Sequence, residues 1–336
     1  MKILFDHPNP FLLRHGGLQI QIEQTMAGLQ QLGQDVEFLR WWDDRQTGDV
    51  IHYFGRPLRH YVAAAQEKGI RVVLADLFGG LGARPAIVRA VQRSIMHAAG
   101  RALPEEFTFR LGWDSYAMAD ACIAITPWEG QLMVEMFSAP PRKVHFVPNG
   151  VESVFLESIA TTRGPWLVCT ANICAQKRIL ELAKAAMEAE TPVWIIGKPF
   201  TEADAYVQAF FELARRNPKW IRYEGPIYDR AQLAAAYREA RGFALLSQYE
   251  SLSLSALEAA ACGCPLLLGD LPWARSMFAD RAQYCSTTVS IKKTAAVLAR
   301  FYQDAPRLQP PPRPKSWVEV AQQLVTIYEA ACNTSR

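Results

Sequence analysis

The feature that most restricts the fold of this sequence is a regular alternation of short apolar runs with longer helical segments. Each run has the length of a strand and is bounded by glycine, proline or polar residues, which is typical of buried strands. Such runs occupy residues 2–6, 35–39, 49–53, 72–76, 121–126 and 143–147, and then 166–171, 193–197, 221–225, 243–246 and 266–269. Strands that alternate with helices predict an α/β fold with a doubly wound parallel sheet in each half, whose ligands bind beyond the carboxyl ends of the strands.

The length of the chain predicts two domains. A chain of 336 residues can supply each of two domains with a core of its own. We place one Rossmann-like domain at residues 1–155 and a second at residues 156–315, after which residues 316–332 form an amphipathic helix capped by Ser316.

Composition excludes several classes of protein. A net charge of +3 and a pI of about 8.4 are too mild for a nucleic-acid binder. The apolar runs are too short to span a membrane and no signal peptide is seen, so we expect a cytoplasmic protein. The seven cysteines form no C-x-x-C pair and are expected to be reduced core residues. No G-x-G-x-x-G follows a strand, which disfavours a dinucleotide oxidoreductase.

Two carboxylates mark the stretch from Gly242 to Gly269, which is expected to form a strand, a turn and a helix. The helix is apolar nearly all round, so we expect it to be buried, and Glu258 is its only charge. A buried carboxylate needs a partner. Either Glu258 closes a capping box with Ser255, or it binds the hydroxyl pair of a ligand. Glu250 precedes the helix, whose N-terminus favours a phosphate.

The pair Glu250 and Glu258, within ESLSLSALEAAACGCPLL, resembles the E-x7-E nucleotide-sugar motif of the retaining glycosyltransferases of family 4. That family belongs to the glycogen-phosphorylase and glycosyltransferase superfamily and has the GT-B fold, in which two Rossmann-like domains face each other across a cleft. The resemblance implies that Glu258 accepts ribose hydroxyls and that Glu250 orients the sugar. It also implies that the N–H groups of Ser253 and Leu254 hold the phosphate, although the two glycines usual in this loop are serines here.

A pair of cations follows the first strand of the second half. Lys177 and Arg178 are expected to open an amphipathic helix, where they would hold a diphosphate and offset the charge on a leaving nucleotide. Relatives usually carry an arginine five residues before the lysine, and here Asn172 stands at that position. The resemblance also places contacts to the nucleotide base near Gly225.

The first half contributes a glycine loop and three candidates on the acceptor side. Gly16 and Gly17 stand between the first strand and the first helix, where backbone N–H groups can approach a phosphate or a sugar, as in the family's N-terminal loop. Relatives often have a His-Asp pair after a later strand, and only Asp76 of that pair is present. His52 and His7 are candidates to replace the histidine.

A basic segment lies between Arg84 and Arg101. One interpretation is a solvated basic face, and the other is a weak peripheral contact with an anionic membrane or an acidic acceptor. The basic residues are Arg84, Arg89, Arg93, His97 and Arg101, beside an apolar side of Ile87, Val88, Val91 and Ile95.

Together these features predict a retaining glycosyltransferase that moves a sugar from a nucleotide diphosphate sugar to a hydroxyl of an unidentified glycan, lipid or small molecule. Residues 1–155 would bind the acceptor and residues 156–315 the donor, and by resemblance the helix at 316–332 would pack back onto the first domain. No Asp-x-Asp motif is present, so we expect neither a metal nor another cofactor, and Glu250, Lys177 and Arg178 would carry the chemistry. The alternative is a degenerate protein on the same scaffold that binds a nucleotide sugar or a partner without turnover.

Overall fold

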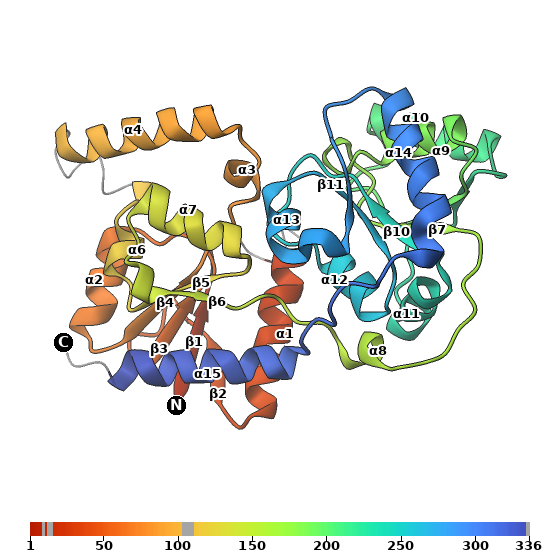
Figure 1. Cartoon of the computed structure of the whole chain (residues 1–336). Helices are drawn as coiled ribbons and strands as arrows, with labels where there is room; N and C mark the ends of the chain where they lie inside the picture. The colour runs from red at the N-terminus through yellow and green to blue at the C-terminus, as the bar shows by residue number, and fades with distance from the viewer. Residues whose placement is uncertain (9–10, 12–15, 103–110, 334–336) are drawn as a thin grey trace. The chain divides into compact units, whose positions relative to one another are not determined.

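The computed structural model describes residues 1–8, 11, 16–102 and 111–333. The chain forms two compact units. The first combines Met1–Gly150 with Lys315–Arg336, and the second is Val151–Pro314 (Figure 1).

The first unit is built on a six-stranded parallel sheet with the order β2-β1-β3-β4-β5-β6. Its strands are β1 (Lys2–Asp6), β2 (Asp35–Phe38), β3 (Val50–Tyr53), β4 (Arg71–Ala75), β5 (Ala121–Ala124) and β6 (Val144–Phe146). Strand β1 pairs with β2 on one side, where Ile3 is in register with Val36, and with β3 on the other, where Ile3 is in register with Val50. The strand order therefore reverses between β1 and β3, and ligands of doubly wound sheets bind at such a point.

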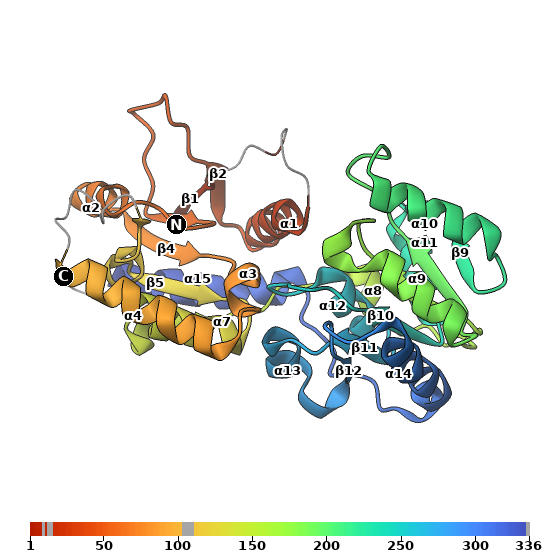
Figure 2. The ribbon, with the colours of Figure 1, turned by 90° about the horizontal axis from the view of Figure 1, so that it is seen from above.

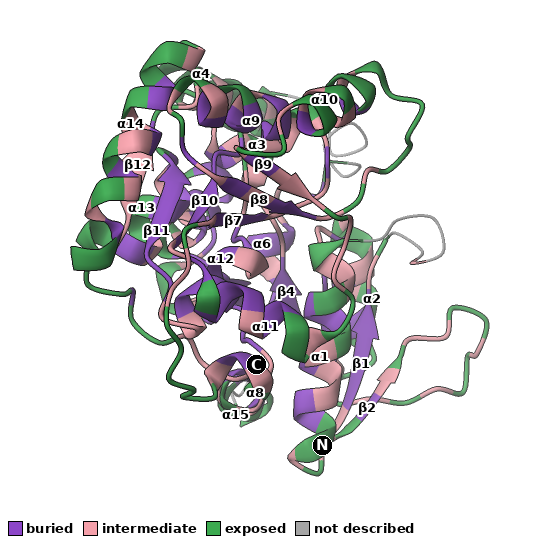
Figure 3. Ribbon diagram, turned by 90° about the vertical axis from the view of Figure 1, so that its right-hand side faces the viewer, coloured by how far each residue is buried: buried purple, intermediate pink, exposed green. Residues whose placement is uncertain are grey.

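Helices cover both faces of this sheet, and the central strands are buried almost throughout (Figure 3). The helices are α1 (Gly17–Gln31), α2 (Arg59–Glu67), α3 (Gly79–Gly82), α4 (Ala86–Ala102), α6 (Ser115–Met118), α7 (Pro127–Phe137) and α15 (Trp317–Asn333), with a 3₁₀ turn η2 (Pro141–Lys143). The C-terminal helix α15 packs against α1. Only glycine fits at position 28 of α1 without a shift, because a Cβ there would lie 2.8 Å from the carbonyl oxygen of Trp317.

The second unit has a parallel sheet of the same size with the order β12-β11-β10-β7-β8-β9. Its strands are β7 (Leu167–Thr170), β8 (Val193–Ile196), β9 (Ile221–Tyr223), β10 (Gly242–Leu245), β11 (Leu266–Gly269) and β12 (Gln283–Cys285). The chain runs outward from β7 to β8 and β9, then returns to the other side of β7 with β10. The reversal of strand order lies between β7 and β10.

The helices of the second unit alternate with its strands, as Figure 2 shows from a second direction. They are α8 (Ser153–Leu156), α9 (Ile179–Glu188), α10 (Ala205–Arg216), α11 (Arg230–Glu239), α12 (Leu254–Ala261), α13 (Pro272–Phe278) and α14 (Ile291–Asp304). Short 3₁₀ turns are η3 (Ala175–Lys177), η4 (Ala279–Arg281) and η5 (Ala305–Arg307).

The two parallel sheets with alternating helices confirm the predicted fold class. Every apolar run that the sequence placed as a strand forms one. Strand β12 was not predicted from the sequence, because this three-residue strand at the edge of the sheet buries only Cys285 and so shows no apolar run.

Candidate functional site

Two loops meet at the point where the strand order of the second unit reverses. The turn η3 follows β7, and the loop before α12 follows β10. The backbone N–H of Gln248 donates to the carbonyl oxygen of Gln176 at 2.8 Å, and the Gln176 side chain donates to the carbonyl oxygen of Tyr249 at 3.1 Å. These bonds join the two loops, so residues far apart in sequence lie side by side at the carboxyl ends of the strands.

The joined loops bring Lys177 and Glu250 into an ion pair between Nζ and Oε1. The Lys177 side chain is 20% exposed and the Glu250 side chain 11%, so the pair is screened only in part by water. The structure thus places together two of the residues that the sequence analysis singled out for chemistry.

Arg178 corrects one expectation. Lys177 belongs to the 3₁₀ turn and Arg178 has a left-handed backbone with φ of 54°, so helix α9 begins only at Ile179 and neither cation lies within it. The left-handed residue redirects the chain from the turn into the helix. Arg178 is buried at 6% exposure, and its Nε has no hydrogen-bond partner among the described residues. A buried guanidinium nitrogen without an acceptor is unusual, and a bound anion would supply one.

Helix α12 begins earlier than a capping box would require. Ser253 is its N-cap, and the Ser253 Oγ accepts from the N–H of Ala256 at 3.3 Å and lies 3.0 Å from the Ser255 Oγ. Ser255 therefore lies inside the first turn, and the interpretation that Glu258 caps its own helix is wrong.

Glu258 instead has two side-chain partners on helix α11. Its Oε1 accepts from Nη2 of Arg230, and its Oε2 accepts from the Tyr237 hydroxyl at 3.1 Å. Arg230 also donates from Nε to Oε1 of Glu152 at 2.8 Å, and its guanidinium lies 4.7 Å from the ring centre of Phe155. One guanidinium therefore bridges two carboxylates.

Burial sets the protonation of this cluster. Burial raises the pKa of the Glu258 carboxyl, although the charge of Arg230 and the bond from Tyr237 lower it in part. Burial opposes the charged form of Arg230, but Glu258 and Glu152 outweigh it and raise the pKa of Arg230. Burial and the neighbouring Glu258 raise the pKa of Tyr237 well above its usual range, so its hydroxyl remains a donor.

The turns after β8 and β9 lie at the same edge of the sheet. Gly225 has φ of 86°, and its carbonyl oxygen accepts from the N–H of Gly197 at 3.3 Å. Gly197 admits no side chain, because a Cβ would lie 1.9 Å from the carbonyl oxygen of Ala171.

Tyr228 follows these turns with 73% of its surface exposed, and Nζ of Lys198 lies 5.7 Å from its ring centre. Asn172 is half-buried in the loop after β7.

The carboxyl edge of the first sheet holds a second group of polar side chains. Asp6 ends β1 and accepts from the Tyr61 hydroxyl at 2.5 Å and from Nε1 of Trp41 at 3.3 Å. Asp76, which follows β4, accepts from Nη2 of Arg56 at 3.2 Å and from the hydroxyl of Tyr116. Of these six residues, only Asp76 was identified from the sequence.

The two histidine candidates differ in position. His52 is 2% exposed, and its Nδ1 lies 2.5 Å from the hydroxyl oxygen of Tyr328 on α15, so it is a core residue and not an acceptor-side residue. His7 follows Asp6 at the edge of the sheet and stacks on Phe11, with 4.4 Å between ring centres.

The glycine loop keeps its expected position. Gly16 is the N-cap of α1 and Gly17 is its first residue. The part of this loop at residues 12–15 lies outside the described residues.

Comparisons with known proteins identify the fold. The glycosyltransferase of Rickettsia africae ESF-5 is similar over 99% of both chains, with 11% identity and a TM-score of 0.67. HepE of Anabaena, solved in complex with UDP and glucose, is similar over 98% of this chain and 100% of its own, with 13% identity and a TM-score of 0.66. Sucrose-phosphate synthase of Thermosynechococcus elongatus is similar over 98% and 99%, with 14% identity and a TM-score of 0.69. The fold is that of the GT-B glycosyltransferases.

Within this GT-B chain, residues 169–323 match the family of glycosyl transferases group 1. The match includes the loops that carry Lys177 and Glu250 and the helix that carries Glu258, and it supports glycosyl transfer as the activity. A comparison with curated proteins found no match.

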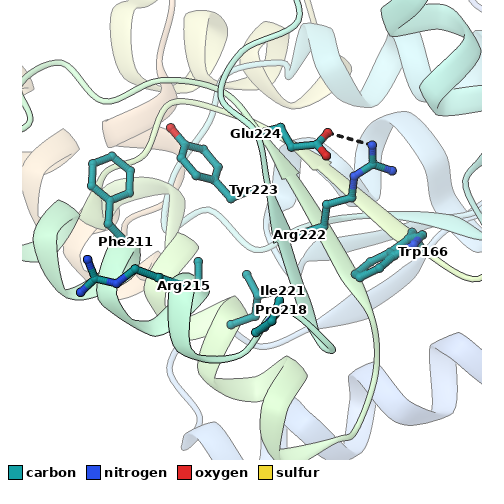
Figure 4. A pocket seen from close by; sticks show the side chains of 9 residues that line it. Trp166, Phe211, Arg215, Pro218, Ile221, Arg222, Tyr223 and Glu224 are labelled. Atoms are coloured by element: carbon teal, nitrogen blue, oxygen red, sulfur yellow. Dashed lines mark hydrogen bonds and ion pairs between the residues drawn. The ribbon is translucent and has the colours of Figure 1, made fainter.

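This GT-B chain also has a cavity away from these residues. The cavity, of about 660 Å³, runs along the edge strand β9 and helix α10, and its lining includes none of Lys177, Glu250 and Glu258 (Figure 4). Arg222 and Glu224 form an ion pair of 2.8 Å at its rim. This cavity is therefore separate from the candidate site.

Two further findings concern metals and membranes. Within residues 1–8, 11, 16–102 and 111–333, no group of three or more His, Cys, Asp or Glu side chains is arranged to hold a metal ion. In the same part of the chain, no helix combines the length and the apolar character needed to cross a membrane.

Three residues of the cluster around Glu258 were not predicted from the sequence: Arg230, Tyr237 and Glu152. Arg230 is the first residue of α11, after the loop that follows β9 and with Asp229 as the N-cap, and this position at the carboxyl edge of the sheet was its only signal in the sequence. Tyr237 and Glu152 gave no signal, because their role depends on the packing of α11 against α12 and α8.

Proposed function

We propose that this protein is a retaining, metal-independent glycosyltransferase that moves a sugar from a nucleoside diphosphate sugar to an acceptor hydroxyl. The observation that carries the proposal is the ion pair of Lys177 with Glu250, beside the buried Arg178, where the strand order of the second unit reverses. The match of residues 169–323 to glycosyl transferases group 1 supports the same conclusion. The second unit would bind the donor and the first unit the acceptor.

The diphosphate would be held by the two cations. Lys177 would exchange Glu250 for a phosphate oxygen. The Nε of Arg178, which has no partner among the described residues, would donate to a second phosphate oxygen. The N–H groups of Ser253 and Leu254 would donate at the start of α12. These groups would offset the charge on the leaving nucleotide without a metal.

The same exchange would free Glu250 for the sugar. Once Lys177 has turned to the phosphate, the Glu250 carboxylate has no cation and can accept from sugar hydroxyls. In the retaining mechanism that we propose, the leaving phosphate takes the proton of the acceptor hydroxyl, so no side chain has to act as the nucleophile.

Glu258 would accept from the ribose hydroxyls. Arg230 and Tyr237 hold its carboxylate in place, and a carboxylate has lone pairs to spare beyond the two bonds that they donate. The exposed ring of Tyr228, beside Gly225, would stack on the base. HepE was solved with UDP and glucose, so we propose a uridine nucleotide as the first donor class to test.

The acceptor side would use His7 and Asp76, together with Asp6. Each stands at or just past the end of a strand in the first unit. Asp76 is bound by Arg56 and Tyr116, so it would act by orienting these donors rather than as a free base. The acceptor would be a glycan, a lipid or a small molecule.

A donor panel tests this function. The pure protein is incubated with UDP-, GDP- and ADP-sugars, with and without EDTA, and free nucleotide is measured. We expect slow hydrolysis of one donor class, unchanged by EDTA and lost in Lys177→Met. Release that requires a divalent cation would contradict metal independence, and an inverted anomeric product would contradict retention.

The alternative is a protein that binds a nucleotide sugar without turnover. Asn172 in place of the usual arginine and Asp76 without its histidine favour it. A rise in melting temperature with a donor and no nucleotide release, in the same panel, would establish this alternative.

A further inference from the structure

Helix α4 is attached to the first unit along one narrow side. Figures 1 and 2 show it beside α7. Met96 is buried at 6% exposure, and the guanidinium of Arg89 lies 4.6 Å from the ring centre of Trp128 on α7. Gln92 is half-buried and donates to the sulfur of Met96. Most other side chains between Ala86 and Gly100 are exposed.

The exposed surface of α4 includes an apolar stripe. Ile87, Val88, Val91 and Ile95 are 72%, 45%, 53% and 62% exposed. Their spacing places them on one face of the helix. A single exposed hydrophobic side chain is ordinary, but four together on one face form a patch that water solvates poorly and that marks an interaction surface.

A row of basic residues runs beside this stripe. Arg89, Arg93 and His97 recur at every fourth position, and Arg84 lies just before the helix. No Asp or Glu occurs between Arg84 and Ala102. Arg84 donates to the side-chain oxygen of Gln92, and Arg89 donates to the backbone carbonyl oxygen of Arg84, so both acceptors are neutral. The stripe and the row together are typical of a helix that lies in a membrane interface.

We propose that α4 docks the protein on a bilayer that contains anionic phospholipid. The apolar stripe would enter the boundary between headgroups and acyl chains, while Arg84, Arg93 and His97 lie against lipid phosphates. This inference does not depend on the proposed function, because neither the residues nor the measurement involve a nucleotide.

The charges favour a membrane over a second copy of the chain. Two copies of α4 packed through their stripes would bring two basic rows close together with no acidic residue between them, which is unfavourable. Other exposed aromatic residues lack this combination. Trp41 and Trp42 are 72% and 84% exposed but precede Asp43 and Asp44, whose charges an anionic surface repels.

Vesicle flotation tests the proposal. The full chain is mixed with vesicles of phosphatidylcholine alone or with phosphatidylglycerol, at low and at high salt. We expect binding to the anionic vesicles that weakens with salt, and about tenfold less bound protein for Ile87→Gln, Val91→Gln and Ile95→Gln combined. Arg84→Gln with Arg93→Gln should also weaken binding.

Control variants test whether the loss of any exposed apolar side chains or charges has the same effect. Ile159→Gln with Phe200→Gln removes exposed apolar side chains of the second unit, and Lys292→Gln with Lys293→Gln removes exposed charges of α14, so both should bind as the unchanged protein does. Thermal melting should show that the α4 variants fold. Absent binding to anionic vesicles, or binding unchanged in the α4 variants, would overturn the proposal. A dimer in sedimentation that the apolar α4 variant loses, without vesicle binding, would assign the stripe to a second copy.

Discussion

Glu258 is a carboxylate on a buried, largely apolar helix, and its ionised form is tolerated because Arg230 and Tyr237 bind it. Burial disfavours the ionised form and raises the pKa of the carboxyl. The two partners stabilise the ionised form and offset part of this effect. These bonds explain how the carboxylate that we propose to bind the ribose can lie on an apolar helix.

Arg230→Gln should destabilise the second unit more at pH 8 than at pH 5. The change leaves Glu258 buried without a cation, so its raised pKa rises further and the penalty sets in as pH increases through that pKa. We expect a loss of about 2 kcal/mol at pH 8, below the ~3 kcal/mol of a fully buried pair because the Arg230 side chain is 35% exposed. Urea unfolding at the two pH values measures it.

The double variant Arg230→Gln with Glu258→Gln is the control for this titration. It removes the carboxyl that titrates, so the additional loss at pH 8 that Arg230→Gln causes should disappear. If Arg230→Gln lowers the free energy of unfolding equally at pH 8 and pH 5, the ionisation of Glu258 is not the cause of the destabilisation.

His52 makes the first unit sensitive to acid. Burial lowers its pKa from 6.5 to about 3, so the unfolded chain binds a proton that the folded chain excludes, and stability falls as pH drops from 6.5 towards 3. Relative to His52→Gln, the unchanged protein should lose about 1.5 kcal/mol between pH 6.5 and about pH 5. Unfolding midpoints of both proteins across this range measure the difference, and parallel curves would contradict it.

At the scale of elements, Arg163 joins the ends of two helices that carry site residues. Its guanidinium donates to the carbonyl oxygen of Ala240 at 2.7 Å, just after α11, and to that of Gly263 at 2.7 Å, just after α12. Cations at helix C-termini satisfy carbonyl groups and oppose the helix dipole. Arg163 therefore holds together the helices that bear Tyr237 and Glu258.

Arg163→Met should destabilise the second unit by about 2 kcal/mol, because it leaves several carbonyl oxygens without a donor. Arg313→Met is the matched control, since Arg313 is exposed and donates to the single carbonyl oxygen of Leu156, and it should cost about 0.5 kcal/mol. Thermal unfolding of both variants measures the difference. Equal melting temperatures would show that Arg163 does not stabilise the helix ends.

At the scale of the molecule, the alternation of strands and helices was enough to predict the α/β fold. A near-continuous apolar run such as that of β10 predicts a strand that is buried on both faces. Such strands occur in parallel sheets that are covered by helices on both sides. The loops that carry Glu250 and Lys177 could also be placed at one edge, because parallel strands end together.

What the sequence could not show depends on contacts between distant elements. Arg230 meets Glu258 only because α11 packs on α12, and His52 meets Tyr328 only because α15 packs back onto the first unit. The left-handed backbone of Arg178 gave no local signal, since arginine rarely adopts it. These residues became visible only in the folded chain.

The central claim is that Glu258 binds the ribose of a nucleotide at the edge of the second sheet. Calorimetric titration of the full chain with the nucleoside diphosphate preferred in the donor panel tests it directly. Glu212→Gln is the matched control, because Glu212 is exposed on α10 and paired only with Arg216 among the described residues. We expect Glu258→Gln to weaken binding by about tenfold or more, since it replaces a charged acceptor with a neutral one, and Glu212→Gln to leave it unchanged. Equal dissociation constants for Glu258→Gln and the unchanged protein would contradict the claim.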